Sequence, residues 1–194
     1  VKEKMNNKNV LFLSYSKHQY KLFRFLCNNM KYGNTFLITS LTAFFGGIFI
    51  RHQLLSQTDI DELIKYSYLK FSARWQQDEV ALISRLYYKY LVFKAKTFNK
   101  YYYRYLKKKA IDLLVVWNGS PLEVASGVKA ARNLGIKVIF MENGFFPQTL
   151  VMDEKGVNAA NSLVGKTADF YQKVQINPEK LARLKEIKLV PREL

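Results

Sequence analysis

Cysteine is almost absent from this 194-residue sequence, which contains Cys27 alone. A single cysteine excludes an internal disulfide and any site that binds a metal through several thiolates. Cys27 lies in a run with helical spacing, Leu22–Met30, and we expect it to be buried as a small apolar side chain. A reducing compartment is the natural setting for such a chain.

Acidic residues are also scarce. The sequence has 31 Lys and Arg against 15 Asp and Glu, which gives a net charge of +16. Such a charge favours anionic partners, whether nucleic acid, acidic lipid headgroups, or negatively charged sugars and nucleotides. Charge alone does not choose among these partners.

No long apolar run is present. The N-terminus is polar and basic, unlike a signal peptide. The most apolar stretch, Thr35–Ile50, is shorter than the ~20 residues that a membrane span needs, and polar residues and the Gly46-Gly47 pair interrupt it. We interpret it as a buried strand followed by an apolar loop, with a turn at the glycine pair.

Several well-known motifs are missing as well. The sequence has no P-loop, no G-x-S-x-G elbow, and no G-x-G-x-x-G after its first apolar run, which argues against a P-loop NTPase and a dinucleotide enzyme. His18 and His52 are 34 residues apart, and neither has other ligand-type residues near it. We therefore expect no metal site.

The chain is long enough to bury a core, and its apolar runs predict an α/β fold. The run Val10–Leu13 is typical of a buried strand, and Thr35–Thr39 is typical of a second strand. Between them, Ser16 is typical of the residue that caps a helix, here one over Lys17–Met30. Further on, strand, helix and strand recur in a compact β-α-β unit with parallel strands. Its segments are Ile111–Trp117, a helix over Leu122–Leu134 that stops at Gly135, and Lys137–Met141.

These patterns predict a Rossmann-like parallel sheet with flanking helices over residues 1–175. Residues 176–194 would form a C-terminal helix, which opens at Pro178, or the start of an interdomain linker. Another helix is expected over Asp59–Phe71, with Thr58 or Asp59 as its cap.

A long helical pattern, Asp78–Lys109, mixes lysines with aromatics and has no acidic residue between Glu79 and Asp112. It fits a wide buried stripe with a solvated lysine face, a surface that docks on anionic lipid, or a nucleic-acid surface. No nucleic-acid motif accompanies the charge, so we expect no nucleic-acid partner. The expected buried stripe is Leu82, Leu86, Tyr90, Phe93, Thr97, Tyr101 and Tyr105. The residues expected to face a membrane or another anion are Lys96, Lys100, Arg104, Lys107, Lys108 and Lys109.

Polar residues follow both strands of the β-α-β unit, where ligands of parallel α/β sheets bind. Asn118-Gly119-Ser120 follows the first strand and suits a sugar hydroxyl, a phosphate or a carboxylate, although it also fits an ordinary turn and helix cap. Glu142-Asn143-Gly144 follows the second strand. The carboxylate of Glu142 suits acid–base or nucleophilic chemistry at that position. Alternatively, it accepts hydrogen bonds from neighbouring backbone amides and fixes the loop.

Taken in order, the segments W-N-G at 117–119, E-N-G-x-x-P at 142–147 and D-x-x-G-V-N at 153–158 resemble the bacterial capsule polysaccharide biosynthesis family. The proteins of that family are Kdo transferases, which move an acidic sugar from a CMP-activated donor to a glycan or lipid acceptor. The resemblance covers about residues 111–161. It implies the N-terminal, acceptor-side half of a GT-B glycosyltransferase, peripheral to the cytoplasmic face of the inner membrane, with neither metal nor other cofactor.

The resemblance also implies roles for single residues. Glu142 would be the catalytic carboxylate, as base, nucleophile or electrostatic support. The residues that would bind substrate are Asn118, Gly119, Ser120, Asn143, Gly144, Pro147, Gln148, Asp153 and Asn158. The His-Pro pair that related enzymes use for CMP is absent, so catalysis would need a C-terminal half. The alternative function is a non-catalytic basic scaffold that binds anionic membrane or glycan.

Overall fold

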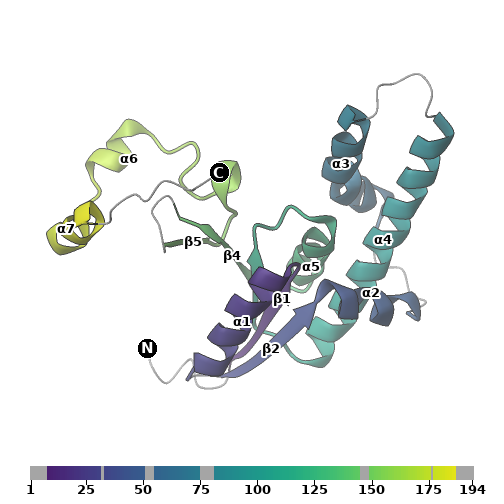
Figure 1. Cartoon of the computed structure of the whole chain (residues 1–194), viewed down its shortest axis with the longest axis horizontal. Coiled ribbons are helices and arrows are strands. Elements are labelled where there is room, and N and C mark those ends of the chain that lie inside the picture. Colours follow the sequence, from purple (N-terminus) through teal and green to yellow (C-terminus); the bar gives the residue numbers. More distant parts are fainter. Residues whose placement is uncertain are drawn as a thin grey trace.

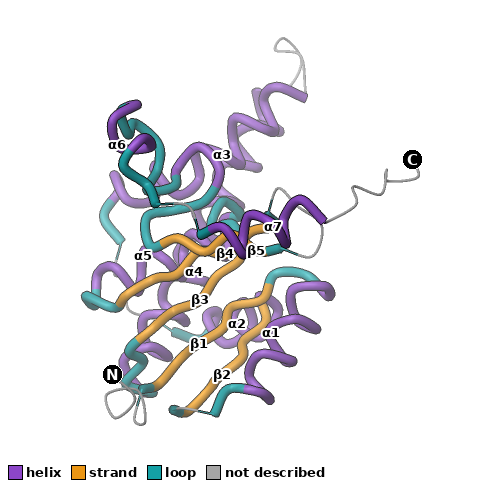
Figure 2. Tube along the Cα trace, turned by 90° about the vertical axis from the view of Figure 1, so that its left-hand side faces the viewer, coloured by secondary structure: helices purple, strands orange, loops and turns teal. Residues whose placement is uncertain are grey.

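A mixed sheet lies at the centre of the fold. The computed structural model describes residues 8–31, 33–50, 55–74, 81–144, 149–175 and 177–186. Within them, five strands lie in the order β2-β1-β3-β4-β5, as Figure 2 shows. β1 to β4 are parallel, and β5 is antiparallel to β4. The strands are β1 (Asn9–Ser14), β2 (Asn34–Thr39), β3 (Leu113–Trp117), β4 (Lys137–Asn143) and β5 (Leu150–Asp153).

Helices cover both faces of the sheet, so the predicted Rossmann-like α/β fold with flanking helices is confirmed (Figure 1). Because side chains alternate along a strand, β1 sends Phe12 to one face and Leu11 and Leu13 to the other. Phe12 packs with Phe23 of α1, whereas Leu11 and Leu13 join the core under α4 and α5. The helices are α1 (Lys17–Asn29), α2 (Ser40–Ile48), α3 (Gln57–Arg74), α4 (Ala81–Lys108), α5 (Leu122–Asn133), the short η2 (Asn158–Ala160), α6 (Ala168–Gln172) and α7 (Pro178–Glu186).

Local sequence signals place several helix ends correctly. Ser16 caps α1 in a capping box, in which its Oγ accepts from the amide of Gln19 and its own amide donates to the Gln19 side chain. Gly135 follows α5 with φ of +68°, a conformation that glycine adopts at little cost. Cys27 of α1 is half-buried rather than buried, and this burial raises the pKa of its thiol.

The predicted turn at Gly46-Gly47 and the apolar loop around it are wrong, because both glycines lie inside α2. They are there because α2 crosses α4 closely. A Cβ on Gly46 would lie 2.4 Å from the ring of Tyr101, and one on Gly47 would lie 2.2 Å from the carbonyl oxygen of Thr97. α2 has nine residues, and in the described segments no helix is long and apolar enough to cross a membrane.

The predicted buried stripe of α4 is also mostly wrong. Thr97 is buried, but Leu82, Leu86, Tyr90 and Phe93 are 47–70% exposed. The reason is that the N-terminal half of α4 extends past the sheet beside α3, so its outer side stays uncovered (Figure 1). The stripe that the core covers is rotated around the helix and consists of Leu91, Ala95, Phe98, Tyr102 and Leu106.

The cap of α3 is Ser56 rather than Thr58 or Asp59. The Oγ of Ser56 accepts from the amide of Asp59 at 3.1 Å, and the Asp59 carboxylate accepts from the amide of Ser56 at 3.2 Å. Asp59 therefore acts as the third residue of a reciprocal capping pair and not as the cap itself.

Candidate functional site

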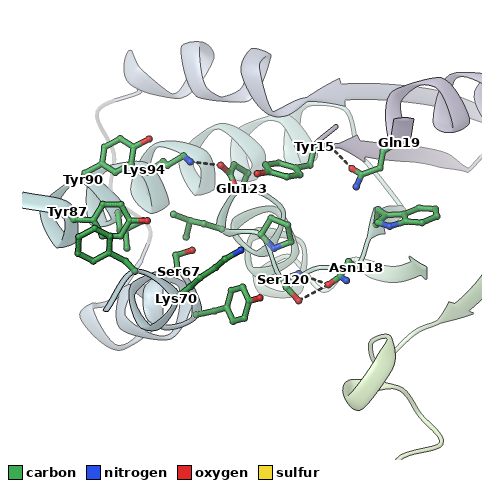
Figure 3. Close-up of a pocket in the computed structure, with 16 residues that line it drawn as sticks. Tyr15, Gln19, Ser67, Lys70, Tyr87, Tyr90, Lys94, Asn118, Ser120 and Glu123 are labelled. Carbon is green, nitrogen blue, oxygen red and sulfur yellow. Dashed lines mark hydrogen bonds and ion pairs between the residues drawn. The ribbon is translucent and has the colours of Figure 1, made fainter. Parts of the chain in front are cut away.

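A cleft of about 630 Å³ opens where the chain connections diverge between β1 and β3 (Figure 3). From β1 the chain passes through α1 to β2, whereas from β3 it passes through α5 to β4 on the opposite side of the sheet. In open α/β sheets, ligands bind at such a switch point, outside the carboxyl ends of the strands. Tyr15 lines the cleft just after β1, and Trp117, Asn118 and Ser120 line it at the end of β3.

The walls of the cleft combine aromatic rings with polar groups. Rings come from α3 and α4, where Phe71 and Tyr87 stack with their centroids 4.2 Å apart. Lys70 extends from α3 toward the turn after β3 (Figure 3). A sugar presents C–H groups that pack on rings and hydroxyls that pair with amides and hydroxyls, so this lining suits it. The remaining polar lining side chains are Gln19, Ser67, Lys94, Asn118, Ser120 and Glu123.

An ion pair between Lys94 of α4 and Glu123 of α5 forms one side of the cleft. The two side chains are only 21% and 11% exposed. Burial alone would lower the pKa of Lys94, but the hydrogen bond and charge of Glu123 outweigh it and raise this pKa above its ordinary value. Because the pair neutralises the carboxylate, Lys70 gives the lining a net positive charge.

The turn after β3 is held in a conformation that its residue types permit. Asn118 and Gly119 have φ of +64° and +86°. A Cβ on Gly119 would lie 2.6 Å from the ring of Phe140, so only glycine fits there. The Ser120 hydroxyl donates to Asn118 Oδ1 at 2.7 Å, which orients the amide, and Asn118 Nδ2 donates to Glu142 Oε2 at 2.7 Å.

A second cavity, of about 370 Å³, lies at the same turn and is also lined by Asn118, Gly119 and Ser120. It contains cations from α5, namely Lys129 and Arg132, and Lys155 from the loop after β5. Lys129 is paired with Asp59 of α3 at 2.6 Å. The predicted turn therefore contributes to the lining of two cavities.

Glu142 is the carboxylate that the sequence singles out, and it lies within β4 rather than in a loop after it. Its Oε2 accepts from Asn118, and its Oε1 accepts from the amide of Asn143 at 3.0 Å. The two carboxylate oxygens of Glu142 thus accept hydrogen bonds from the turn after β3 and from the backbone of β4, as the loop-fixing alternative predicts. Glu142 is not one of the described residues that line the two cavities. It is connected to both cavities through the side chain of Asn118.

The region after Glu142 contains β5, which forms a hairpin with β4. The amide of Gly144 donates to the carbonyl oxygen of Thr149 at 2.8 Å and closes that hairpin. Pro147 and Gln148, both predicted to bind substrate, lie outside the described residues.

Asp153 is the last residue of β5, and Asn158 begins η2. The hydrogen bonds described for both go to the segment that follows β5. Asp153 accepts hydrogen bonds from the amides of Lys155, Gly156 and Ser162 and from the Ser162 hydroxyl. These bonds, that of the hydroxyl foremost, hold the pKa of Asp153 far below its ordinary value. Asn158 is exposed with φ of +54°. The structure therefore groups Asn118, Gly119, Ser120, Glu142 and Asn143, and leaves these two apart.

Five of the six predicted anion-facing residues lie in the second half of α4, and the sixth, Lys109, directly follows the helix. Lys96 and Lys100 are half-buried, and Lys100 Nζ donates to the carbonyl oxygen of Ile50 at 3.0 Å. The other four are exposed: Arg104, Lys107, Lys108 and Lys109.

Sequence reasoning missed much of the cleft lining, including Tyr15, Gln19, Lys70 and Glu123. Tyr15 carries a usable signal, because it follows β1 just as Asn118 follows β3. Within the described segments, no group of three or more His, Cys, Asp or Glu side chains is placed to hold a metal ion.

Comparison with known proteins yields one partial match. Protein FixF of Sinorhizobium fredii (strain NBRC 101917 / NGR234) is 45% identical to this chain over 60 residues. These residues make up 31% of this chain and 14% of FixF. No protein-family model matches the chain, and no solved structure matches it.

Proposed function

We propose that the chain is a glycosyltransferase domain of the Kdo-transferase type. It would transfer Kdo or a similar acidic sugar from a CMP-activated donor to a glycan or lipid acceptor in capsule or surface polysaccharide synthesis. The observation that carries the proposal is the cleft at the β1/β3 switch point, with the Asn118–Ser120 turn at its base. The ordered segments W-N-G, E-N-G-x-x-P and D-x-x-G-V-N supply the reaction class by resemblance.

The charges of the cleft favour an anionic sugar. Lys70 reaches into it, and Lys94 neutralises Glu123. α5 begins at the same place, and its N-cap Pro121 makes no side-chain cap, so the amides of its first turn can donate to a ligand carboxylate or phosphate. A sugar acid would therefore find a cation, helix amides and ring faces in one cavity of suitable size.

Glu142 would act from beside the cleft. To meet a substrate hydroxyl directly, its carboxylate would release Asn118 Nδ2, which it now holds at 2.7 Å. Alternatively, it fixes the Asn118 amide for hydrogen bonding to the sugar and is a positioning residue. No metal or other cofactor is required by either role.

Binding by the chain itself is the first test. Isothermal titration with Kdo and with a neutral hexose should give binding of the acid only, and Lys70→Met should weaken it about tenfold by removing a cation. Lys21→Met, on α1 and outside the cleft lining, is the matched control and should bind as wild type does. Equal affinity for the neutral hexose, or equal loss in both variants, would contradict the proposed ligand.

Transfer is the second test, in a transferase that contains this chain and a donor-binding half. Glu142→Gln keeps an oxygen for Asn118 but removes the charge, and we expect transfer to be abolished with the fold intact. Turnover near the normal rate in that variant would remove Glu142 from the chemistry. Asn118→Ala should then still reduce sugar binding if the positioning role is correct.

A further inference from the structure

α2 and Phe49, the residue that follows it, present a row of uncovered apolar side chains. Leu41, Phe45, Ile48 and Phe49 are 65%, 57%, 42% and 85% exposed. The opposite side of the helix is fixed, because Ala43 and Gly47 are buried against the core and α4. Exposed large apolar residues that cluster on one element mark a surface that binds something apolar.

The adjoining face of α4 continues this surface. Phe44 of α2 meets Phe93 of α4 edge to face, with ring centroids 6.2 Å apart, and Phe93 is itself 48% exposed. Figure 1 shows α2 lying against α4 at the edge of the molecule. We call the exposed residues Leu41, Phe45, Ile48, Phe49, Phe93, Arg104 and Lys108 the α2–α4 surface.

Positive charge borders the apolar residues. A shallow groove beside α2 is lined by Phe49 together with Arg104 and Lys108 of α4. Neither α2 nor α4 contains an acidic residue. A surface that joins bulky apolar side chains to cations alone complements an anionic bilayer, whose headgroups attract the cations while its acyl chains accept the rings.

We propose that the α2–α4 surface docks on an anionic lipid bilayer, with α2 lying in the plane of the headgroup boundary. With about 1.5 Å of rise per residue, the nine residues of α2 are about 14 Å long, less than half of the ~30 Å hydrocarbon core. The helix therefore lies on the membrane and does not cross it.

The docking surface and the cleft adjoin through α4. Phe93 faces α2, whereas the next residue, Lys94, lines the cleft and is paired with Glu123. A bilayer that holds α2 would thus adjoin the same helix that forms one wall of the cleft.

Vesicle sedimentation tests the proposal without any sugar or transfer assay, so its outcome is independent of the proposed reaction. The chain should sediment with phosphatidylglycerol vesicles, fail to do so with phosphatidylcholine vesicles, and lose binding as salt rises. Phe49→Ser should reduce the partition coefficient about tenfold. Phe25→Ser, which changes a 62% exposed ring of α1 on the other face of the sheet, is its matched control.

A charge-matched pair separates local docking from general attraction. Arg104→Glu with Lys108→Glu and Lys17→Glu with Lys21→Glu each change the net charge by −4, but only the first pair borders α2. The first should lose at least tenfold in partition coefficient and the second less than twofold, with unchanged circular dichroism in all variants. Equal losses in both pairs, or absence of binding to the anionic vesicles, would overturn the proposal. So would a dimer that Phe49→Ser dissociates, because a second copy would then occupy the surface.

Discussion

Replacing Asn118 by glycine and by alanine separates what its side chain does from what its backbone requires. Both variants lose the hydrogen bond to Glu142, which contributes about 1 kcal/mol because the carboxylate is partly exposed. Glycine adds ~0.5–1 kcal/mol of unfolded-state entropy. Alanine instead places a Cβ at φ of +64°, a strain of ~1–2 kcal/mol. We therefore expect losses of about 1.5–2 kcal/mol for Asn118→Gly and about 2–3 kcal/mol for Asn118→Ala.

Urea denaturation gives both values, and tryptophan fluorescence reports them well because Trp117 directly precedes the turn. The two variants should differ in the urea concentration at the midpoint of unfolding but not in the slope of the unfolding free energy against urea concentration. If Asn118→Ala proved as stable as Asn118→Gly, the left-handed conformation of this turn would be refuted. If both variants had the same free energy of unfolding as the wild type, the hydrogen bond to Glu142 would contribute nothing to stability.

Three further substitutions have definite expected outcomes. Gly47→Ala should cost about 1–3 kcal/mol in urea denaturation, because its Cβ would press on the Thr97 carbonyl; an unchanged midpoint would contradict the close helix crossing. Lys94→Met leaves the Glu123 carboxylate unpaired and should cost about 2 kcal/mol at pH 7, with a smaller loss when Glu123→Gln accompanies it. Because the pKa of Asp153 is lowered in the folded state, its contribution is complete above pH ~4 and declines as the pH falls further. Thermal melting of Asp153→Asn should thus differ from wild type more at pH 7 than at pH 3, and an equal difference at both would contradict that shift.

The sheet could be predicted because its strands are continuous apolar runs that end at polar turns. Such runs are typical of parallel strands that are buried on both faces, and β1, β3 and β4 all have this pattern. The Ser16 capping box and Gly135 mark helix ends through local hydrogen bonding and backbone conformation. These features depend only on residues close together in the sequence.

Other features depend on contacts between distant segments, which the sequence does not display. The Gly46-Gly47 pair looks like a turn until α4 lies against it, and only then does its role in a close helix crossing become evident. The buried face of α4 likewise depends on where α2, α3 and the sheet touch it. A helix rich in tyrosine and phenylalanine offers several apolar stripes, and tertiary packing selects among them.

The candidate site divides in the same way. Asn118, Gly119 and Ser120 could be placed because ligand sites lie at strand ends, and Asn118 does meet Glu142. Lys70 and Tyr87 could not, because they come from helices that reach the cleft only through the packing of α3 on α4. Asp153 resembles a ligand-binding acid in sequence, yet it accepts four hydrogen bonds from the loop that follows β5.

If the proposed transfer and the proposed docking both hold, their adjacency on α4 makes a kinetic prediction. In a transferase that contains this chain, Phe45→Ser with Phe49→Ser should raise KM for an acceptor embedded in anionic vesicles about tenfold and leave kcat unchanged. KM for a water-soluble acceptor should not change, because neither side chain lines the cleft. Equal increases for both acceptors would mean that the substitutions disturb the cleft through Phe93 and Lys94, and that the surface does not present the acceptor.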